Sequence, residues 1–161
     1  AGVFYPAIGL LLRPEIAVLE TCRELGAAFV AFSPLARGFL AGAPRDAGTL
    51  ETRDLRRGMP RFAPEAYAAN LKLLDGYRTI AAEAGATPAQ LALAWLLSRG
   101  EHVVPIPGTT PLAHLQDNVG AAAFQLSDDV LKRLDVLINR HTVTGGRYDA
   151  AAQAGVDTEE F

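Results

Sequence analysis

The chain has 161 residues, 50% of them hydrophobic and 20% charged, which is typical of one globular unit with a sizeable core. A formal net charge of −3 and a pI near 5.6 argue against a nucleic-acid-binding surface. The single cysteine, Cys22, excludes an internal disulfide, and no Cys/His spacing resembles a metal site. No apolar run approaches the roughly 20 residues of a membrane span, so we expect a cytoplasmic protein without a membrane partner.

The first elements alternate between apolar segments and a helix. Val3–Ile8 is a candidate strand, although Pro6 counts against a central position in a sheet. Helical spacing predicts a helix over Pro14–Leu25, with Gly26 at its C-terminal cap. The apolar run Ala27–Phe32 indicates a buried parallel strand, which gives a strand–helix–strand order.

The middle of the chain begins with a long loop, Ser33–Arg61, that is rich in glycine and proline. Loops of this length in a compact domain are usually functional or mobile. A helix is predicted over Pro64–Ala84, and another opens after Thr87, where the sequence TPAQ is a capping box with proline at the first helical position. This second helix runs to about Ser98, and we expect its Trp95 to lie in the core.

The last part contains a third candidate strand, Val103–Ile106, and two further helices. Thr110 is suited to cap a helix over Pro111–Val119. The last helix is predicted over Ser127–Ile138. We expect the Gly- and Ala-rich tail, residues 141–161, to be loosely ordered.

The turn after the third candidate strand is the most informative feature. Gly108 stops the strand, and the hydroxyl residues Thr109 and Thr110 precede Pro111. A strand that enters a helix through such a turn directs unpaired N–H groups and the positive end of the helix dipole at one place, which favours an anion. In β/α barrels a phosphate commonly binds in the loops after strands seven and eight. The turn is therefore a candidate phosphate site.

The element order predicts an α/β fold with parallel strands. A closed (β/α)8 barrel typically takes about 250 residues. Because this chain shows about three strands with surrounding helices, we expect residues 1–161 to form one incomplete part of a barrel.

Three motifs together resemble the aldo-keto reductases. They are FSPLARGFL at Phe32–Leu40, TPAQLALAWLL at Thr87–Leu97, and VVPIPGTT with Asp117-Asn118 downstream. Their order matches the C-terminal half of that family, and the stretches RRGMPRF and VTGGRY are similar to the branch near the potassium-channel β-subunits. The resemblance implies the C-terminal part of a TIM barrel that binds NADP(H) and reduces aldehydes or ketones by hydride transfer.

The resemblance also implies which residues contact the cofactor. Phe32 would stack on the nicotinamide ring, and residues 33–37 would line the diphosphate after the seventh strand. Residues 108–110 would hold the adenosine 2′-phosphate after the eighth strand, and the Asp-Asn pair would contact the adenine. The implied cofactor-binding set, which includes no metal ligand, is Phe32, Ser33, Pro34, Leu35, Ala36, Arg37, Gly108, Thr109, Thr110, His114, Asp117 and Asn118.

Two positions depart from the family pattern. Pro111 stands where relatives often have a lysine or arginine, and His114 stands where they often have an arginine. Neutral histidine adds little positive charge at pH 7, so the preference for NADP is weakened unless other cations compensate. Candidates for compensation lie in the long loop, although arginines there are more typical of a solvated surface: Arg37, Arg56, Arg57 and Arg61.

Several implied cofactor residues also have an ordinary structural explanation. Phe32 could be a core residue and Ser33 a turn residue. The two threonines after Gly108 could simply cap a helix, which is compatible with phosphate binding. His114 could face solvent, and the Asp-Asn pair could be surface polar residues.

The family's catalytic Asp, Tyr, Lys and His belong to its N-terminal half, and we assign no catalytic residue to this chain. We therefore expect the chain to supply cofactor contacts to an enzyme acting on a small-molecule carbonyl substrate. The alternatives are a non-catalytic, cofactor-sensing interaction subunit and an inactive truncated product. In the last case unpaired barrel edges would favour self-association.

Overall fold

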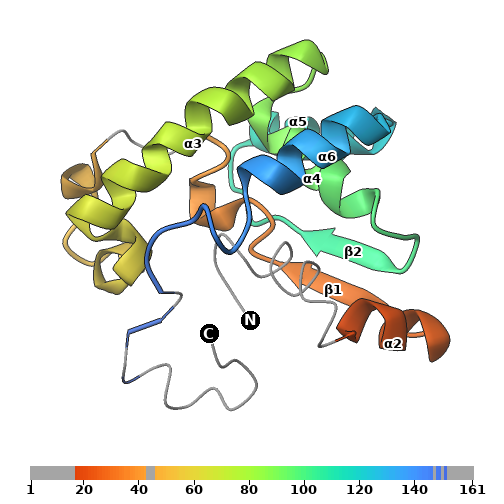
Figure 1. Cartoon of the computed structure of the whole chain (residues 1–161), viewed down its shortest axis with the longest axis horizontal. Coiled ribbons are helices and arrows are strands. Elements are labelled where there is room, and N and C mark those ends of the chain that lie inside the picture. Colours follow the sequence, from red (N-terminus) through yellow and green to blue (C-terminus); the bar gives the residue numbers. More distant parts are fainter. Residues whose placement is uncertain (1–16, 43–45, 147, 150, 152–161) are drawn as a thin grey trace.

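The computed structural model describes residues 17–42, 46–146, 148–149 and 151 (Figure 1). These residues contain two short strands, five α-helices and five short 3-10 turns. The helices and strands are α2 (Val18–Glu24), β1 (Phe29–Phe32), α3 (Pro64–Glu83), α4 (Pro88–Leu97), β2 (Val103–Ile106), α5 (Leu112–Gly120) and α6 (Asp128–Leu137). The 3-10 turns are η1 (Ala36–Gly38), η2 (Ala47–Thr49), η3 (Leu55–Gly58), η4 (Pro60–Phe62) and η5 (Ala121–Ala123).

The two strands form a parallel pair in which Phe29 lies opposite Val103 and Phe32 opposite Ile106. Parallel pairing was expected, and β2 has the predicted bounds, whereas β1 is shorter than Ala27–Phe32. Because both strands end at the same edge of the sheet, the turns that follow them lie side by side. The predicted strand Val3–Ile8 lies outside the described residues.

The two faces of the sheet differ in what covers them. Ala31 and Val103 are buried on the face on which α4 packs. On the other face Val30, Val104 and Ile106 are about half exposed, at 52%, 45% and 50%. Side chains alternate between the faces of a strand, so this second face is apolar but uncovered in the described part of the chain.

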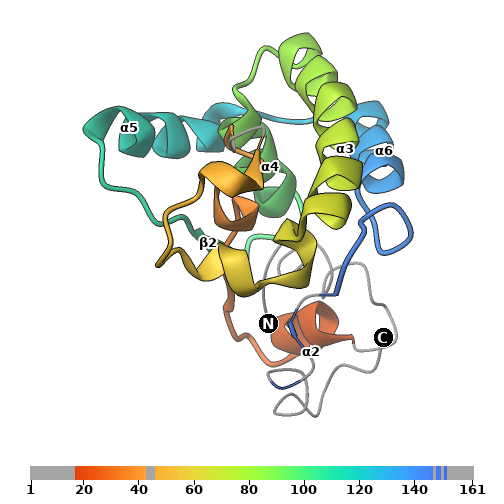
Figure 2. The ribbon, with the colours of Figure 1, turned by 90° about the vertical axis from the view of Figure 1, so that its left-hand side faces the viewer.

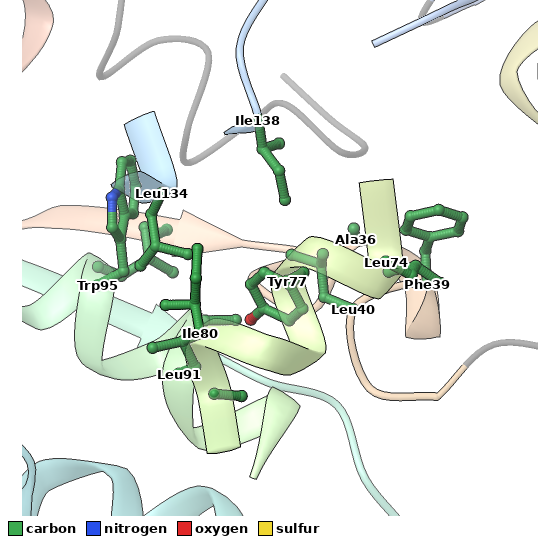
Figure 3. Close-up of a cluster of buried hydrophobic side chains, with 14 of the residues drawn as sticks. Ala36, Phe39, Leu40, Leu74, Tyr77, Ile80, Leu91, Trp95, Leu134 and Ile138 are labelled. Atoms are coloured by element: carbon green, nitrogen blue, oxygen red, sulfur yellow. The ribbon is translucent and has the colours of Figure 1, made fainter. Parts of the chain in front are cut away.

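The core lies between α3, α4 and α6, and Figure 3 shows its side chains meeting from all three helices. Tyr77 and Ile80 of α3 face Leu91 of α4 and Leu134 of α6. Trp95 of α4 is 3% exposed, which confirms its predicted place in the core. In Figure 2, α4 lies between α5 on one side and α3 and α6 on the other.

The carboxylate of Asp135 in α6 links α6 to α4 at the edge of this core. The indole Nε1 of Trp95 donates to Asp135 Oδ1 at 2.8 Å, and Arg99 donates to the same oxygen at 2.6 Å. The Arg99 guanidinium also lies 3.9 Å from the centre of the Trp95 ring. One carboxylate oxygen therefore joins residues from two helices.

Helix ends follow the capping residues in most places. The capping box at Thr87 is present, Ser127 accepts from Val130 N at the start of α6, and α3 begins at the predicted Pro64. The prediction for α5 was wrong by one residue: Pro111, in extended conformation with ψ 135°, occupies the N-cap position, so Thr110 caps no helix. Proline cannot donate an N–H, which makes either position tolerable to it.

The first described helix, α2, differs from its prediction in burial. In the described part it begins at Val18, while the predicted start, Pro14, lies outside the described residues. Gly26 follows the helix with φ +65°, as expected of a C-terminal glycine. Leu25, predicted on its apolar face, is 76% exposed, while Cys22 is half-buried. No residue of α2 is fully buried, and Leu19 is its residue that packs against the core cluster.

The beginning of the tail is held by hydrogen bonds, although we expected residues 141–161 to be loosely ordered. The fully buried Asn70 accepts from Thr144 N at 2.8 Å and donates to Thr144 O at 2.9 Å. Arg61 Nε donates to Gly145 O at 2.9 Å. Gly145 has φ +91°, and a Cβ there would lie 3.0 Å from Arg61 Cα, so this turn requires glycine.

Among the described residues no single helix is long and apolar enough to cross a bilayer; α3 and α4 meet that criterion only together, bent by 79°.

Candidate functional site

A cavity of about 700 Å³ lies where the turns after β1 and β2 meet one face of α5. The carboxyl ends of parallel strands are the usual place for ligand binding in α/β folds. The residues that line the cavity are Phe32, Ser33, Pro34, Leu35, Arg37, Gly38, Ala41, Gly42, Arg56, Ala89, Ile106, Pro107, Gly108, Thr109, His114, Asp117 and Asn118.

The structure brings ten of the twelve predicted cofactor residues to this one cavity. The exceptions are Ala36 and Thr110. Ala36 is 2% exposed and packs into the core, whereas Thr110 is exposed and is not among the lining residues. The contacts of the ten lining residues with a cofactor remain predictions.

The first wall of the cavity is a tight turn at the end of β1. Ser33, Ala36 and Arg37 have φ of 49°, 52° and 56°, in the left-handed region that non-glycine residues rarely adopt. Each such residue costs roughly 1 kcal/mol or more, and such strain clusters at ligand sites. Phe39 and Leu40, which follow directly, are buried in the core and hold the turn in place (Figure 3).

The second wall comes from the turn after β2 and one face of α5. His114, Asp117 and Asn118 lie three and four residues apart, so they share a face of the helix. Asp117 Oδ2 accepts a hydrogen bond of 2.9 Å from Thr87 Oγ1, which also caps α4. The capping threonine of α4 therefore fixes a carboxylate at the cavity wall.

Three polar atoms at the cavity are buried and have no hydrogen-bond partner. They are Arg37 Nε, Thr109 Oγ1 and Asn118 Nδ2. A buried polar group without a partner costs about 1–3 kcal/mol, and in native structures it usually indicates a missing ligand or water. Two N–H donors and a hydroxyl fit a ligand that carries phosphate and a heteroaromatic base.

Arg56 also lines the cavity, although it is not in the predicted cofactor set. Its Nε and NH2 donate to the two oxygens of Asp54 at 2.6–3.1 Å, and its NH1 donates to Arg37 O at 3.1 Å. The side-chain hydrogen bond from Arg56 lowers the pKa of Asp54 to about 2. The sequence signal was an Asp-Leu-Arg spacing in a loop, which is too common to single out.

The remaining two arginines proposed as compensating cations, Arg57 and Arg61, are directed elsewhere. Arg57 NH1 donates to Leu50 O at 2.7 Å, and Arg61 holds the tail through Gly145 O. Neither lines the cavity. Arg56, Arg57 and Arg61 were candidates to replace the positive charge missing at Pro111 and His114. Of these three, the structure brings only Arg56 to the cavity.

The described tyrosines of α3 are core residues. Tyr67 stacks on Phe62 with ring centres 5.4 Å apart, and Tyr77 OH donates to Pro88 O at 2.6 Å. Burial raises the pKa of both phenols. Neither lines the cavity, and no group of three or more metal-ligating side chains occurs among the described residues.

Comparison with known proteins identifies the family. The aldo/keto reductase family profile matches residues 8–139. The chain is 40% identical over 140 residues to aldo-keto reductase yakc of Schizosaccharomyces pombe, whose name carries NADP(+), covering 87% of this chain and 41% of that protein. It is 42% identical over 137 residues to probable aldo-keto reductase 1 of Glycine max, covering 83% of this chain and 38% of that protein.

A solved structure agrees with these matches. The crystal structure of the thermostable aldo-keto reductase Tm1743 with the inhibitor epalrestat superposes with a TM-score of 0.52 at 32% identity, over 78% of this chain and 35% of that one. The chain thus spans about two fifths of the length of the curated relatives it matches. It belongs to the aldo/keto reductase family.

Proposed function

We propose that this chain is the NADP(H)-binding part of an oxidoreductase that reduces aldehydes or ketones by hydride transfer from NADPH. The observation that carries the proposal is the cavity at the carboxyl ends of β1 and β2, with three buried polar atoms that lack partners. Family membership and the NADP(+)-named yeast relative support the choice of cofactor.

The residues of the cavity divide into those that suit a ring and those that suit phosphate. Phe32, at the end of β1, offers an aromatic face for the nicotinamide. Arg37 Nε and Thr109 Oγ1 offer hydrogen bonds to phosphate oxygens, and Asn118 Nδ2 offers one to a base nitrogen. Bound NADPH would supply the hydride, while these residues bind and orient it.

We also propose that the described fold is the C-terminal part of a TIM barrel, from the branch near the potassium-channel β-subunits. The uncovered apolar face formed by Val30, Val104 and Ile106 suits the interior of a barrel that further strands complete. The share of its relatives that the chain spans supports the same view. The proton donor for a carbonyl substrate would then come from the rest of the barrel.

Titration of the chain with NADPH, followed by nucleotide fluorescence, tests the binding step. We expect saturable binding that weakens in Phe32→Ala, because the aromatic face is lost. Phe124→Ala is the control, since Phe124 is a half-buried aromatic residue outside the cavity. Absence of saturation at millimolar NADPH, or equal effects of the two variants, would refute the proposed site.

A further inference from the structure

Arg56 connects two parts of the long loop that are 19 residues apart. Its NH1 donates to the carbonyl of Arg37, whose backbone is in the left-handed conformation at φ 56° and ψ 39°. Nearby, a Cβ added to Gly38 would lie 3.5 Å from Arg56 NH1. The guanidinium therefore rests directly on the strained turn that forms the first wall of the cavity.

Asp54 holds this guanidinium in a defined orientation. The carboxylate binds Nε and NH2 together, and Asp54 Oδ1 also accepts from the backbone N of Arg56 at 2.9 Å, which starts η3. Both side chains are mostly buried, at 24% and 19% exposure for Arg56 and Asp54. A bidentate pair of this kind fixes direction as well as distance.

The hydrogen-bonding capacity of Arg56 is not exhausted by these contacts. A guanidinium has five N–H donors, and the bonds to Asp54 and Arg37 use three of them. Since Arg56 lines the cavity, two donors are left beside it, on a guanidinium whose charge is paired with Asp54. The buried, unpartnered Nε of Arg37 belongs to the same wall.

Charge is distributed unevenly around the cavity. The wall at the turn after β1 carries Arg37 and Arg56, and no carboxylate on that side is among the lining residues. The only acidic residue of the lining, Asp117, lies on α5 and is bound to Thr87. The guanidinium donors of the lining are therefore concentrated at the first wall, which suits an anionic group.

We propose that Arg56, oriented by Asp54, binds a phosphate group of the ligand that occupies this cavity. The inference rests on the proposed function in taking that ligand to be NADP(H). Arg56 then supplies guanidinium hydrogen-bond donors that Pro111 and His114 do not. Asp54 is a positioning residue, because it acts only through Arg56.

Adjacent arginines provide a matched pair of variants. Arg56→Met and Arg57→Met remove the same charge from the same loop, but Arg57 donates to Leu50 O outside the cavity. We expect Arg56→Met to weaken NADPH binding about 10-fold to 100-fold, the usual effect of losing hydrogen bonds to a charged group, and Arg57→Met to change it less than about 2-fold. Equal effects of the two variants would overturn the proposal.

NADH distinguishes the two phosphate sources, because it keeps the diphosphate and lacks the 2′-phosphate. Equal losses for NADPH and NADH in Arg56→Met indicate contact with the diphosphate, and a loss for NADPH alone indicates contact with the 2′-phosphate. Loss for neither overturns the proposal. Circular dichroism checks folding, and Arg56→Lys, which keeps the charge without the planar fork, should give an intermediate affinity.

Two further measurements separate this inference from its premises. In a double-mutant cycle Asp54→Asn should weaken binding in the wild type but have no further effect in Arg56→Met; an undiminished second effect would refute positioning through Arg56. Inorganic diphosphate is the probe that does not depend on the nicotinamide cofactor. If the chain binds diphosphate through Arg56 but binds no NADPH, the proposed function fails and the anion site stands.

Discussion

Replacing Thr87 by valine removes two hydrogen bonds that link helix formation to the cavity wall. Thr87 Oγ1 accepts from Gln90 N at 3.1 Å as the cap of α4, and it donates to Asp117 Oδ2 at 2.9 Å. Loss of a helix cap typically costs about 1 kcal/mol. A hydrogen bond to a carboxylate at a partly exposed site adds about 1 kcal/mol, so we expect Thr87→Val to destabilise the fold by about 2 kcal/mol.

Thermal unfolding measures this loss, which should lower the Tm by about 4–8 °C for a chain of this size. Two controls isolate the causes. Thr87→Ser retains both bonds and should stay near the wild type, and Ser127→Ala removes the cap of α6, where no link to a neighbouring helix is involved. If Thr87→Val lowers the stability of the fold no more than Ser127→Ala does, the bond to Asp117 does not stabilise the fold and this reasoning is refuted.

Three other predictions concern groups that join distant segments. Asp135→Ala removes the acceptor shared by Trp95 and Arg99, and it should cost about 1–3 kcal/mol in urea unfolding; a loss below about 0.5 kcal/mol would contradict a structural role. Asn70→Ala leaves both polar groups of one tail residue unpaired, so limited proteolysis should cleave the tail faster than in the wild type; unchanged cleavage would show that the clamp does not hold it. The lowered pKa of Asp54 stabilises the fold above about pH 4, and this contribution is lost as the pH falls through about 2. The stability difference between wild type and Asp54→Asn should therefore be constant at neutral pH and close near pH 2; a difference that persists there would contradict the assignment.

Local sequence signals predicted most helices and strands of the described part. The capping box at Thr87 and the apolar run of β2 involve only a few neighbouring residues. The helix start and the strand can therefore be predicted without knowledge of the fold. The exposure of Leu25 could not be read in this way, because helical spacing gives a face but not what lies against it. The same limit applies to Thr144, which is hydrogen-bonded to Asn70 from 74 residues away.

The sequence predicted the site residues that belong to recognisable motifs, but not the residue that long-range contacts bring to the cavity. The motifs after β1 and β2 indicated ten residues that the structure brings to one cavity. Ala36 is in the same motif but is buried in the core, and the motif alone does not show which of its residues pack inward. Arg56 could not be separated from Arg57 by sequence, because only the pairing with Asp54 and the bond to Arg37 direct it to the cavity.

Hydrogen–deuterium exchange of the full chain with and without NADPH tests the central claim most directly. If the cavity is the cofactor site, NADPH should slow exchange in residues 33–38, 54–58 and 108–118, which carry its walls. The helices α3 and α6 lie outside the lining and should exchange unchanged. Protection confined to those helices, or no protection at saturating NADPH, would contradict the assignment of this cavity to the cofactor.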